Sequence, residues 1–377
     1  MTQRAMLVVC ATVAALMLAA CGSSPSQPSA QQRTASSRLT AAWIYVGAPG
    51  DAGWTHQHDL GRLAVQKYFG DKVKTVYKQN VPEGPQATQV INELVNSGAK
   101  IIFSTSFGYQ PAVAAAAKKF PKVYFAQATG TALGTNLSEY FGAGEDGDYL
   151  AGMAAGFATK NGKIGYVAPY PIPEVIREID AYTIGARYAH PGTAVRVVWT
   201  NSWFDPAKER QAAQSLVASG VDVLGDGVDD PTVGQVAAAK GLKWTGYDSN
   251  QNSFAPNAFQ TATVYNWAPY YIKSVKAVMD GAWKSGFYYG SLTDGMIQIA
   301  PFGTTVSAKA RAAINRRLAE IKAGTFNPFT GPLTRQNGTV GLPAGQTLEV
   351  WNQQSPSTLS KYTLNWFVKG VIGSASG

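Results

Sequence analysis

The side chains best suited to chemistry in this chain are aromatic rings, carboxylates, amides and hydroxyls that follow predicted strands. Trp54 and Thr55, for example, end a glycine-rich loop, and an indole in a loop is more typical of a surface than of a core. Stacking a flat base on such a ring contributes about 1–3 kcal/mol. The sequence therefore predicts a site for a flat heteroaromatic ligand. The candidate ligand-binding residues are Trp54, Thr55, Phe107, Trp203, Phe204, Asp229, Asp248, Asn266 and Trp267.

Trp203 and Phe204 are neighbours in a segment that follows a predicted strand. Because adjacent residues of an extended segment point in opposite directions, we expect only one of the two rings to reach the ligand, and the spacing alone does not choose between them. A buried Asp that lacks a hydrogen-bond donor costs about 1–3 kcal/mol. The edge of the ligand must therefore match the acidic residues of the site.

Patterns for catalysis and metal binding are weak in comparison. His56 and His58 have the spacing of a metal pair, but no Cys, Glu or Asp cluster completes it, and a surface helix start is the plainer interpretation. The sequence has neither a Gly-x-Ser-x-Gly turn nor a phosphate-binding loop with Lys. We therefore expect a protein that is not an enzyme and has no cofactor and no metal, with an α/β enzyme as the weakest alternative.

Two series of strands and helices must position these residues. The first series has strands at 42–46, 73–77, 101–104 and 123–126, with helices at 59–69, 86–97 and 111–119. The second has helices at 149–159, 175–188, 207–219 and 233–240, with strands at 163–167, 195–199, 221–224 and 242–247. Alternating βα units with apolar strands predict an α/β fold of two doubly wound parallel-sheet lobes. Ligands of such sheets bind beyond the carboxyl ends of the strands, which places the site between the lobes.

The remaining chain is too fragmentary for a third domain, so we expect it to complete both lobes. The first lobe is predicted to comprise 39–160, about 266–290 and the C-terminal segment, and the second 161–265 and about 300–335. Several crossings between the lobes would form a hinge. Asp205-Pro206 and Asp230-Pro231 predict helix starts, because each pairs an N-cap acceptor with a proline in the first turn.

The N-terminal sequence is typical of an exported lipoprotein. Arg4 precedes an apolar run over 5–20, and small residues lead to Cys21, which predicts a signal peptide over 1–20 and lipidation of Cys21. A transmembrane helix is the alternative, but a span needs about 20 apolar residues. Residues 21–38 are rich in Ser, Pro, Gln and Ala, as in a flexible tether. We expect a protein without disulfides, anchored to the cell membrane and facing the periplasm or the exterior.

Charge does not indicate a nucleic-acid partner. The 377 residues are 45% hydrophobic and 15% charged, with a net charge of +9, but the cations are dispersed. The richest stretch, 309–322, has Ile314, Leu318 and Ile321 at helical spacing, so its cations are expected on the solvent face. We predict no nucleic-acid binding.

Several motifs in order resemble the basic membrane protein family of ABC-transporter substrate-binding lipoproteins, which includes purine nucleoside receptors. The resemblance covers about 41–373. It is carried by Gly-Asp-Ala-Gly-Trp-Thr at 50–55, Asn-Val-Pro-Glu-Gly at 80–84, Thr-Ser-Phe-Gly at 105–108, Ile-Pro-Glu-Val-Ile-Arg at 172–177, Asn-Ser-Trp-Phe-Asp-Pro-Ala-Lys at 201–208, Gly-Tyr-Asp-Ser at 246–249 and Asn-Pro-Phe-Thr-Gly at 327–331.

The resemblance implies a type I periplasmic-binding fold that closes on its ligand as a monomer and delivers it to an ABC permease. It implies that Trp54 stacks on a purine, that Thr55 stands where the family usually has Asn, that the 201–208 motif adds a second aromatic ring, and that Asp248 binds polar edges of the ligand.

Two departures from the family pattern favour a free purine base, adenine above all, over a nucleoside. Nucleoside-binding members carry a ribose-binding Lys on the crossing segment, whereas 260–267 here has none. They also carry an acidic residue shortly after the position of Gly108, where Tyr109 and Gln110 stand here. A ligand sensor and a sugar-binding receptor of the same fold remain the alternatives.

Overall fold

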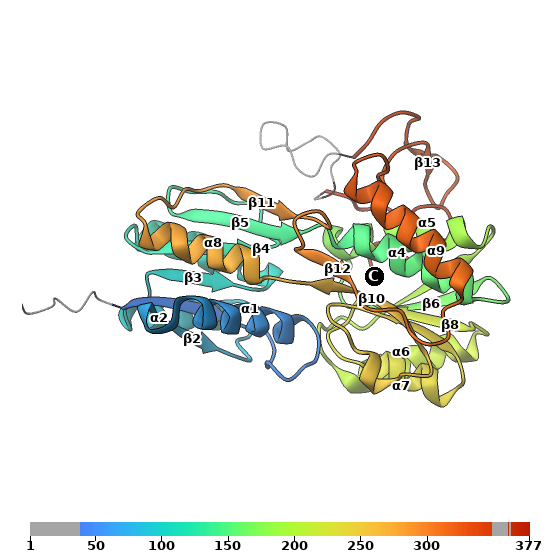
Figure 1. Ribbon diagram of the computed structural model, residues 1–377, viewed down its shortest axis with the longest axis horizontal. Helices are drawn as coiled ribbons and strands as arrows, with labels where there is room; N and C mark the ends of the chain where they lie inside the picture. Colours follow the sequence, from blue (N-terminus) through green and yellow to red (C-terminus); the bar gives the residue numbers. More distant parts are fainter. Residues whose placement is uncertain (1–37, 349–360, 362) are drawn as a thin grey trace, which may run out of the picture. The chain divides into compact units, whose positions relative to one another are not determined.

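Two parallel sheets, each with helices on both faces, carry the fold (Figure 1). The computed structural model describes residues 38–348, 361 and 363–377. The predicted signal peptide, nearly all of the predicted tether and the lipidation site at Cys21 lie outside the described residues. In the described part of the chain, no helix combines the length and apolarity needed to cross a membrane.

The first sheet is parallel throughout, in the order β11-β5-β4-β3-β1-β2. Its strands are β1 (Leu39–Ile44), β2 (Val73–Lys78), β3 (Ile101–Ser104), β4 (Tyr124–Ala128), β5 (Leu137–Gly142) and β11 (Phe287–Gly290). Its helices are α1 (Trp54–Phe69), α2 (Pro85–Asn96), α3 (Gln110–Lys119) and α8 (Ala268–Met279). α1 packs with α8 and α2 with α3, so the two pairs cover opposite faces.

The second sheet has the order β12-β10-β9-β8-β6-β7-β15 and is parallel except for the β10–β12 pair. Its strands are β6 (Lys163–Ala168), β7 (Ala194–Trp199), β8 (Val223–Asp226), β9 (Lys243–Gly246), β10 (Phe259–Tyr265), β12 (Ile297–Ile299) and β15 (Val371–Ile372). The helices are α4 (Gly144–Ala158), α5 (Pro173–Ala189), α6 (Pro206–Ala218), α7 (Thr232–Ala239) and α9 (Ala308–Lys322). β13 (Leu333–Thr334) and β14 (Val340–Leu342) form a small separate ladder.

The first five strands of each sheet, numbered in chain order, lie side by side in the order 2-1-3-4-5, which is a doubly wound arrangement. The predicted fold class, α/β with two parallel-sheet lobes, is therefore confirmed. The chain crosses between the sheets in three places, which are at Ala143, at Asn266 and Trp267, and over 291–296.

Two segments, α4 and β15, belong to the second lobe although they were predicted in the first. α4 falls within the 39–160 range of the predicted first lobe but packs on α5 and β10 of the second. β15 pairs with β7, so the C-terminal strand completes the second sheet and not the first. The difference at α4 follows from β5, which the strand pattern missed, because its Ser138 and Glu139 interrupt the apolar run although both are buried. The first crossing thus comes at residue 143, before α4.

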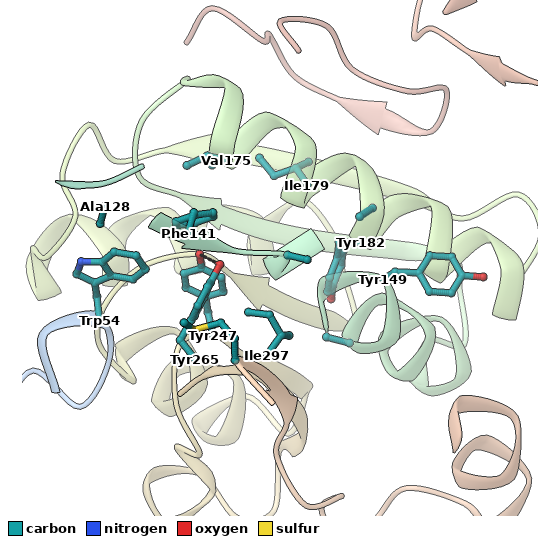
Figure 2. Packing of buried hydrophobic residues seen from close by; sticks show 14 of the residues in the cluster. Trp54, Ala128, Phe141, Tyr149, Val175, Ile179, Tyr182, Tyr247, Tyr265 and Ile297 are labelled. Carbon is teal, nitrogen blue, oxygen red and sulfur yellow. Dashed lines mark hydrogen bonds between the residues drawn. The ribbon is translucent and has the colours of Figure 1, made fainter. Parts of the chain in front are cut away.

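The crossings are packed by aromatic rings (Figure 2). One core cluster extends from Trp54 through Phe141 and Tyr265 to Tyr182 and Tyr149, and so joins the two lobes at their crossings. Phe141 and Tyr265 stand next to the first two crossings, with ring centroids 5.7 Å apart. The segments on which the lobes would turn therefore have a close-packed interior.

Candidate functional site

Loops at the carboxyl ends of strands from both sheets enclose one cavity of about 570 Å³, here named the outer cavity. It is lined by Val46, Gly47, Ala48, Gly50, Asp51, Asn80, Glu83, Tyr170, Ser202, Trp203, Phe204 and Asp229. A space of about 20 Å³, the inner cavity, shares Val46, Trp203 and Asp229 with it. The other residues of the inner cavity are Trp54, Thr105, Ser106, Phe107, Thr129, Glu174 and Tyr247. Because they share these three residues, the two cavities are neighbours, and we treat them as one site.

Trp54 is the first residue of α1 and forms a fixed wall of the inner cavity. Its Nε1 donates a hydrogen bond to the Thr105 carbonyl oxygen at 2.6 Å. Behind it, the rings of His58, Tyr265 and Trp267 contact the indole edge to face, at centroid distances of 4.5, 5.5 and 5.2 Å. The indole thus has one orientation, which suits a stacking platform.

The glycine-rich loop before Trp54 is held by Asp51. The Asp51 carboxylate accepts hydrogen bonds from the backbone N–H groups of Gly53, Thr55 and His56 at 3.0, 2.9 and 2.9 Å. These bonds satisfy free donors at the start of α1, as a helix cap does. Although burial raises the pKa of Asp51, its three backbone bonds oppose that rise.

Glu83 brings a carboxylate to the loop that carries Phe107. It accepts hydrogen bonds from the Ser106 hydroxyl at 2.5 Å and from the Gly108 N–H at 2.8 Å. The loop between β2 and α2 thus places a carboxylate beside Gly108. Phe107 itself lines the inner cavity and is 37% exposed.

Both aromatic residues of the 201–208 motif line the outer cavity, and Trp203 alone also lines the inner one. The Trp203 ring lies 5.1 Å from that of Tyr170, and the Trp203 carbonyl accepts the Asp229 N–H at 3.1 Å. Both rings therefore line the site, and which of them reaches the ligand stays a prediction. The Asp205 side chain caps α6 as predicted by accepting the Lys208 N–H at 3.1 Å.

Three carboxyl groups of the second lobe lie in or beside the inner cavity. Glu174 and Asp229 line it, and Asp248 is completely buried in a left-handed backbone conformation with φ of 60°. Burial, opposed by Arg177, raises the pKa of Glu174 to about 7. Burial also raises the pKa of Asp229 and of Asp248 well above the ordinary range, and Asp51 adds to both shifts.

Some predicted residues line neither cavity. Thr55 and Asp248 are fully buried, Thr55 behind the Asp51 loop and Asp248 beneath Asp229. Asn266 bonds to the Gly295 carbonyl in the second crossing. Trp267 is also fully buried and stacks on Tyr265 and His58, so it supports Trp54 from behind.

The interpretation of His56 and His58 as residues of a surface helix start is wrong for His58. His58 is completely buried, with its Nδ1 atom 2.6 Å from the Tyr271 hydroxyl, whereas His56 lies at the Pro49 carbonyl. Burial holds the pKa of His58 well below its usual range. Within the described residues, no group of three or more His, Cys, Asp or Glu side chains could hold a metal ion.

Several residues that line the cavities were not predicted, although the rule that ligands bind at strand ends would have found some of them. Tyr170 and Glu174 follow β6, so a search of every strand end would have found them. Glu83 and Tyr247 stand within motifs that carried the family resemblance but were not assigned to the site. Neither cavity is lined by Lys or Arg among the residues that the structure describes.

Two doubly wound lobes with three crossings and a cavity between their strand ends are the architecture of the periplasmic solute-binding proteins. In agreement, the fold is similar to that of an ABC-transporter solute-binding protein from Aeropyrum pernix K1, with a TM-score of 0.68 and 17% identity over 77% of this chain and 92% of that one. Residues 39–323 match the model of the PnrA-like ABC transporter substrate-binding proteins. The chain belongs to this family, which is one of substrate-binding proteins and not of enzymes.

Two relatives bear on the ligand. A purine-binding protein of Brucella abortus (strain 2308) is 40% identical over 337 residues, which cover 89% of this chain and 94% of the relative. A putative ABC transporter glucose-binding protein of Haloferax volcanii is 33% identical over 293 residues, covering 78% of this chain and 74% of the relative.

Proposed function

We propose that this protein captures a purine between its two lobes and delivers it to the permease of an ABC importer, and that the purine is a free base such as adenine in preference to a nucleoside. The observation that carries the proposal is Trp54, a fixed indole that lines the inner cavity together with Trp203 of the other lobe. A planar ring between two aromatic side chains gains stacking from both. The purine-binding relative supports the same ligand class.

The preference for a base rests on the polar groups of the site. With no Lys or Arg among its described lining residues, the site offers no cation to the hydroxyls of a ribose. Carboxyl groups at Glu174 and Asp229 suit the ring N–H and amine groups of a base instead. The hydrogen bonds from the Ser106 hydroxyl and the Gly108 N–H occupy one Glu83 oxygen with the Phe107 loop, so that oxygen is less available to a sugar.

Calorimetric titration with adenine, guanine, hypoxanthine and adenosine tests this proposal. We expect tight binding of adenine and weaker binding of adenosine. Tight binding of adenosine together with no binding of adenine would overturn the base preference, and no binding of any purine would overturn the ligand class. The same titration with glucose tests a second candidate, sugar binding, which the Haloferax volcanii relative and the three acidic residues of the outer cavity favour.

Delivery to a permease and anchoring through Cys21 belong to the same proposal. Uptake of labelled adenine by cells that lack this protein tests delivery, because a sensor of the same fold would leave uptake unchanged. Cys21→Ala tests the anchor, because the variant should leave the membrane fraction. Size-exclusion chromatography with and without adenine tests the expected monomer.

A further inference from the structure

The acidic residues of the site differ in how their charge is balanced. Five form the carboxyl cluster: Asp51, Glu83, Glu174, Asp229 and Asp248. The two from the first lobe, Asp51 and Glu83, accept three and two hydrogen bonds from the protein. Of the three from the second lobe, Asp248 has no partner for either carboxylate oxygen among the described residues, and the carboxyl groups of Glu174 and Asp229 line the inner cavity. Within the carboxyl cluster, the group whose charge is not balanced by hydrogen bonds from the described residues is therefore Asp248 of the second lobe.

Closure of the lobes brings these groups together. Asp51 and Asp229 line the same outer cavity from opposite lobes, and the charge of Asp51 raises the pKa of both Asp229 and Asp248. Asp248 is completely buried, and neither of its oxygens has a partner. Arg177 acts on Glu174 but is itself buried against Glu145, with Nε 3.4 Å from the carboxylate. Among the described residues, therefore, no cation stands in the cavity between these groups.

A buried carboxylate without a donor is unfavourable, so such a site needs protons, hydrogen-bond donors or positive charge from elsewhere. A bound ligand can supply the last two. A ligand that is itself negative adds repulsion instead, and placing like charges together at an interface costs several kcal/mol. Burial raises the pKa of Glu174, Asp229 and Asp248, which is the direction expected when a carboxylate loses its contact with water.

We propose that the carboxyl cluster restricts the site to neutral, donor-bearing or cationic heteroaromatic ligands and excludes anionic ones. This inference rests on the purine-binding function proposed above. It assigns amino-bearing bases to the site, and it excludes nucleotides and the deprotonated forms of oxo-rich purines. Asp229 is the residue that discriminates most, because it alone of the cluster lines both cavities.

Xanthine provides the test, because it loses a proton in mildly alkaline solution while adenine stays neutral. Calorimetry should measure the affinity of both purines at one pH below and one pH above the pKa of xanthine. A change seen for xanthine alone then reports the charge of the ligand, whereas a change seen for both reports titration of the protein. We expect xanthine to lose at least about tenfold in affinity on deprotonation and adenine to change by less than about threefold. Asp229→Asn should reduce the loss for xanthine, and Glu174→Gln, a second isosteric variant, should do the same to a smaller extent.

Glu93→Gln is the matched control, since it removes one negative charge from an exposed ion pair with Lys78 on the first lobe. It should leave the loss for xanthine unchanged. Equal affinity for neutral and deprotonated xanthine would overturn the inference and leave purine binding intact. An undiminished loss in both Asp229→Asn and Glu174→Gln would also overturn it. Absence of binding by either purine at both pH values would overturn the proposed function, and the inference with it.

Discussion

In the first lobe, the indole N–H of Trp54 is bonded to Thr105 and the Asp51 carboxylate accepts three backbone N–H groups. In the second lobe, the indole N–H of Trp203 and both oxygens of Asp248 are buried without partners. The same side-chain types therefore stand in or beside one site in two hydrogen-bonding conditions. Among the described residues, the indole N–H and the carboxylate named from the first lobe are bonded without a ligand, and those named from the second lobe are not.

The difference suggests an order of events. A rigid aromatic wall with satisfied polar groups can receive a flat ring without reorganisation, which lowers the cost of binding. The unpaired groups of the second lobe gain most when the ligand brings donors to them. A ligand that touches both lobes stabilises the closed form by its differential affinity for that form. Four variants test this comparison, from the largest expected effect to the smallest.

Removing the fixed ring should have the largest effect. Trp54→Ala should weaken adenine binding at least tenfold, because stacking of a base on an aromatic ring contributes about 1–3 kcal/mol. Titration calorimetry measures the change, and Trp54→Phe, which keeps a ring, should recover most of the affinity. Normal binding by Trp54→Ala would show that the first lobe is not the platform.

Closure itself can be blocked at Gly53. A Cβ atom at this position would overlap the Asp229 carbonyl group across the cleft, whereas one at Gly50 would meet nothing within 4 Å. Gly53→Ala should therefore weaken adenine binding about tenfold, given the usual overpacking cost of about 1–3 kcal/mol. Gly50→Ala is the control and should bind normally. Small-angle scattering with saturating adenine should show a more open Gly53→Ala protein, and unchanged closure would refute the role of this contact.

The unpaired acids of the second lobe should make stability depend on pH. Burial raises the pKa of Glu174 from 4.5 to about 7, so the folded state keeps a proton that the unfolded state has released between these values. Its contribution to stability is thus full below about pH 4.5 and is lost as the pH rises to about 7. The Tm of the ligand-free protein should fall by several degrees between pH 5 and pH 7.5. Glu174→Gln should flatten part of that slope, and an unchanged slope would contradict the assignment.

The smallest effect is expected at the contact between the lobes. The Ser249 hydroxyl donates to the Ala52 carbonyl across the cleft, and Gln251 Nε2 donates to the same oxygen at 3.3 Å. Ser249→Ala should weaken adenine binding by no more than about fivefold, since a neutral hydrogen bond contributes about 1 kcal/mol and Gln251 remains. A loss greater than that of Gly53→Ala would reverse the proposed order.

The fold could be predicted where the strands are apolar runs. β3 is Ile-Ile-Phe-Ser and is fully buried, and its bounds match the prediction of 101–104. β5 was not predicted because its polar residues are buried with partners that only the folded structure supplies. The Ser138 hydroxyl, for instance, forms a hydrogen bond with the Tyr270 hydroxyl. Without β5 the first crossing could not be placed, and α4 was assigned to the wrong lobe.

The residues of the site that follow directly after strands could be predicted from the sequence. Trp54, Phe107, Trp203, Phe204 and Asp229 line the cavities as expected from their loops, although ligand contact by each of them stays a prediction. Trp267 could not be told apart from them by its position after a strand, because only packing decides which face of a ring is covered. Glu83 acts on a loop 25 residues further along the chain, a pairing that no local pattern contains.

The contact of Trp54 with Trp267, at 5.2 Å between ring centroids, gives the molecule a built-in optical reporter. One indole faces the cavity and the other is sealed in the core, yet both share the same aromatic neighbours. A purine stacked on the outer indole should quench its emission and so lower the total indole fluorescence of the protein. Occupancy could then be followed by fluorescence in the unlabelled protein, at the speed of mixing.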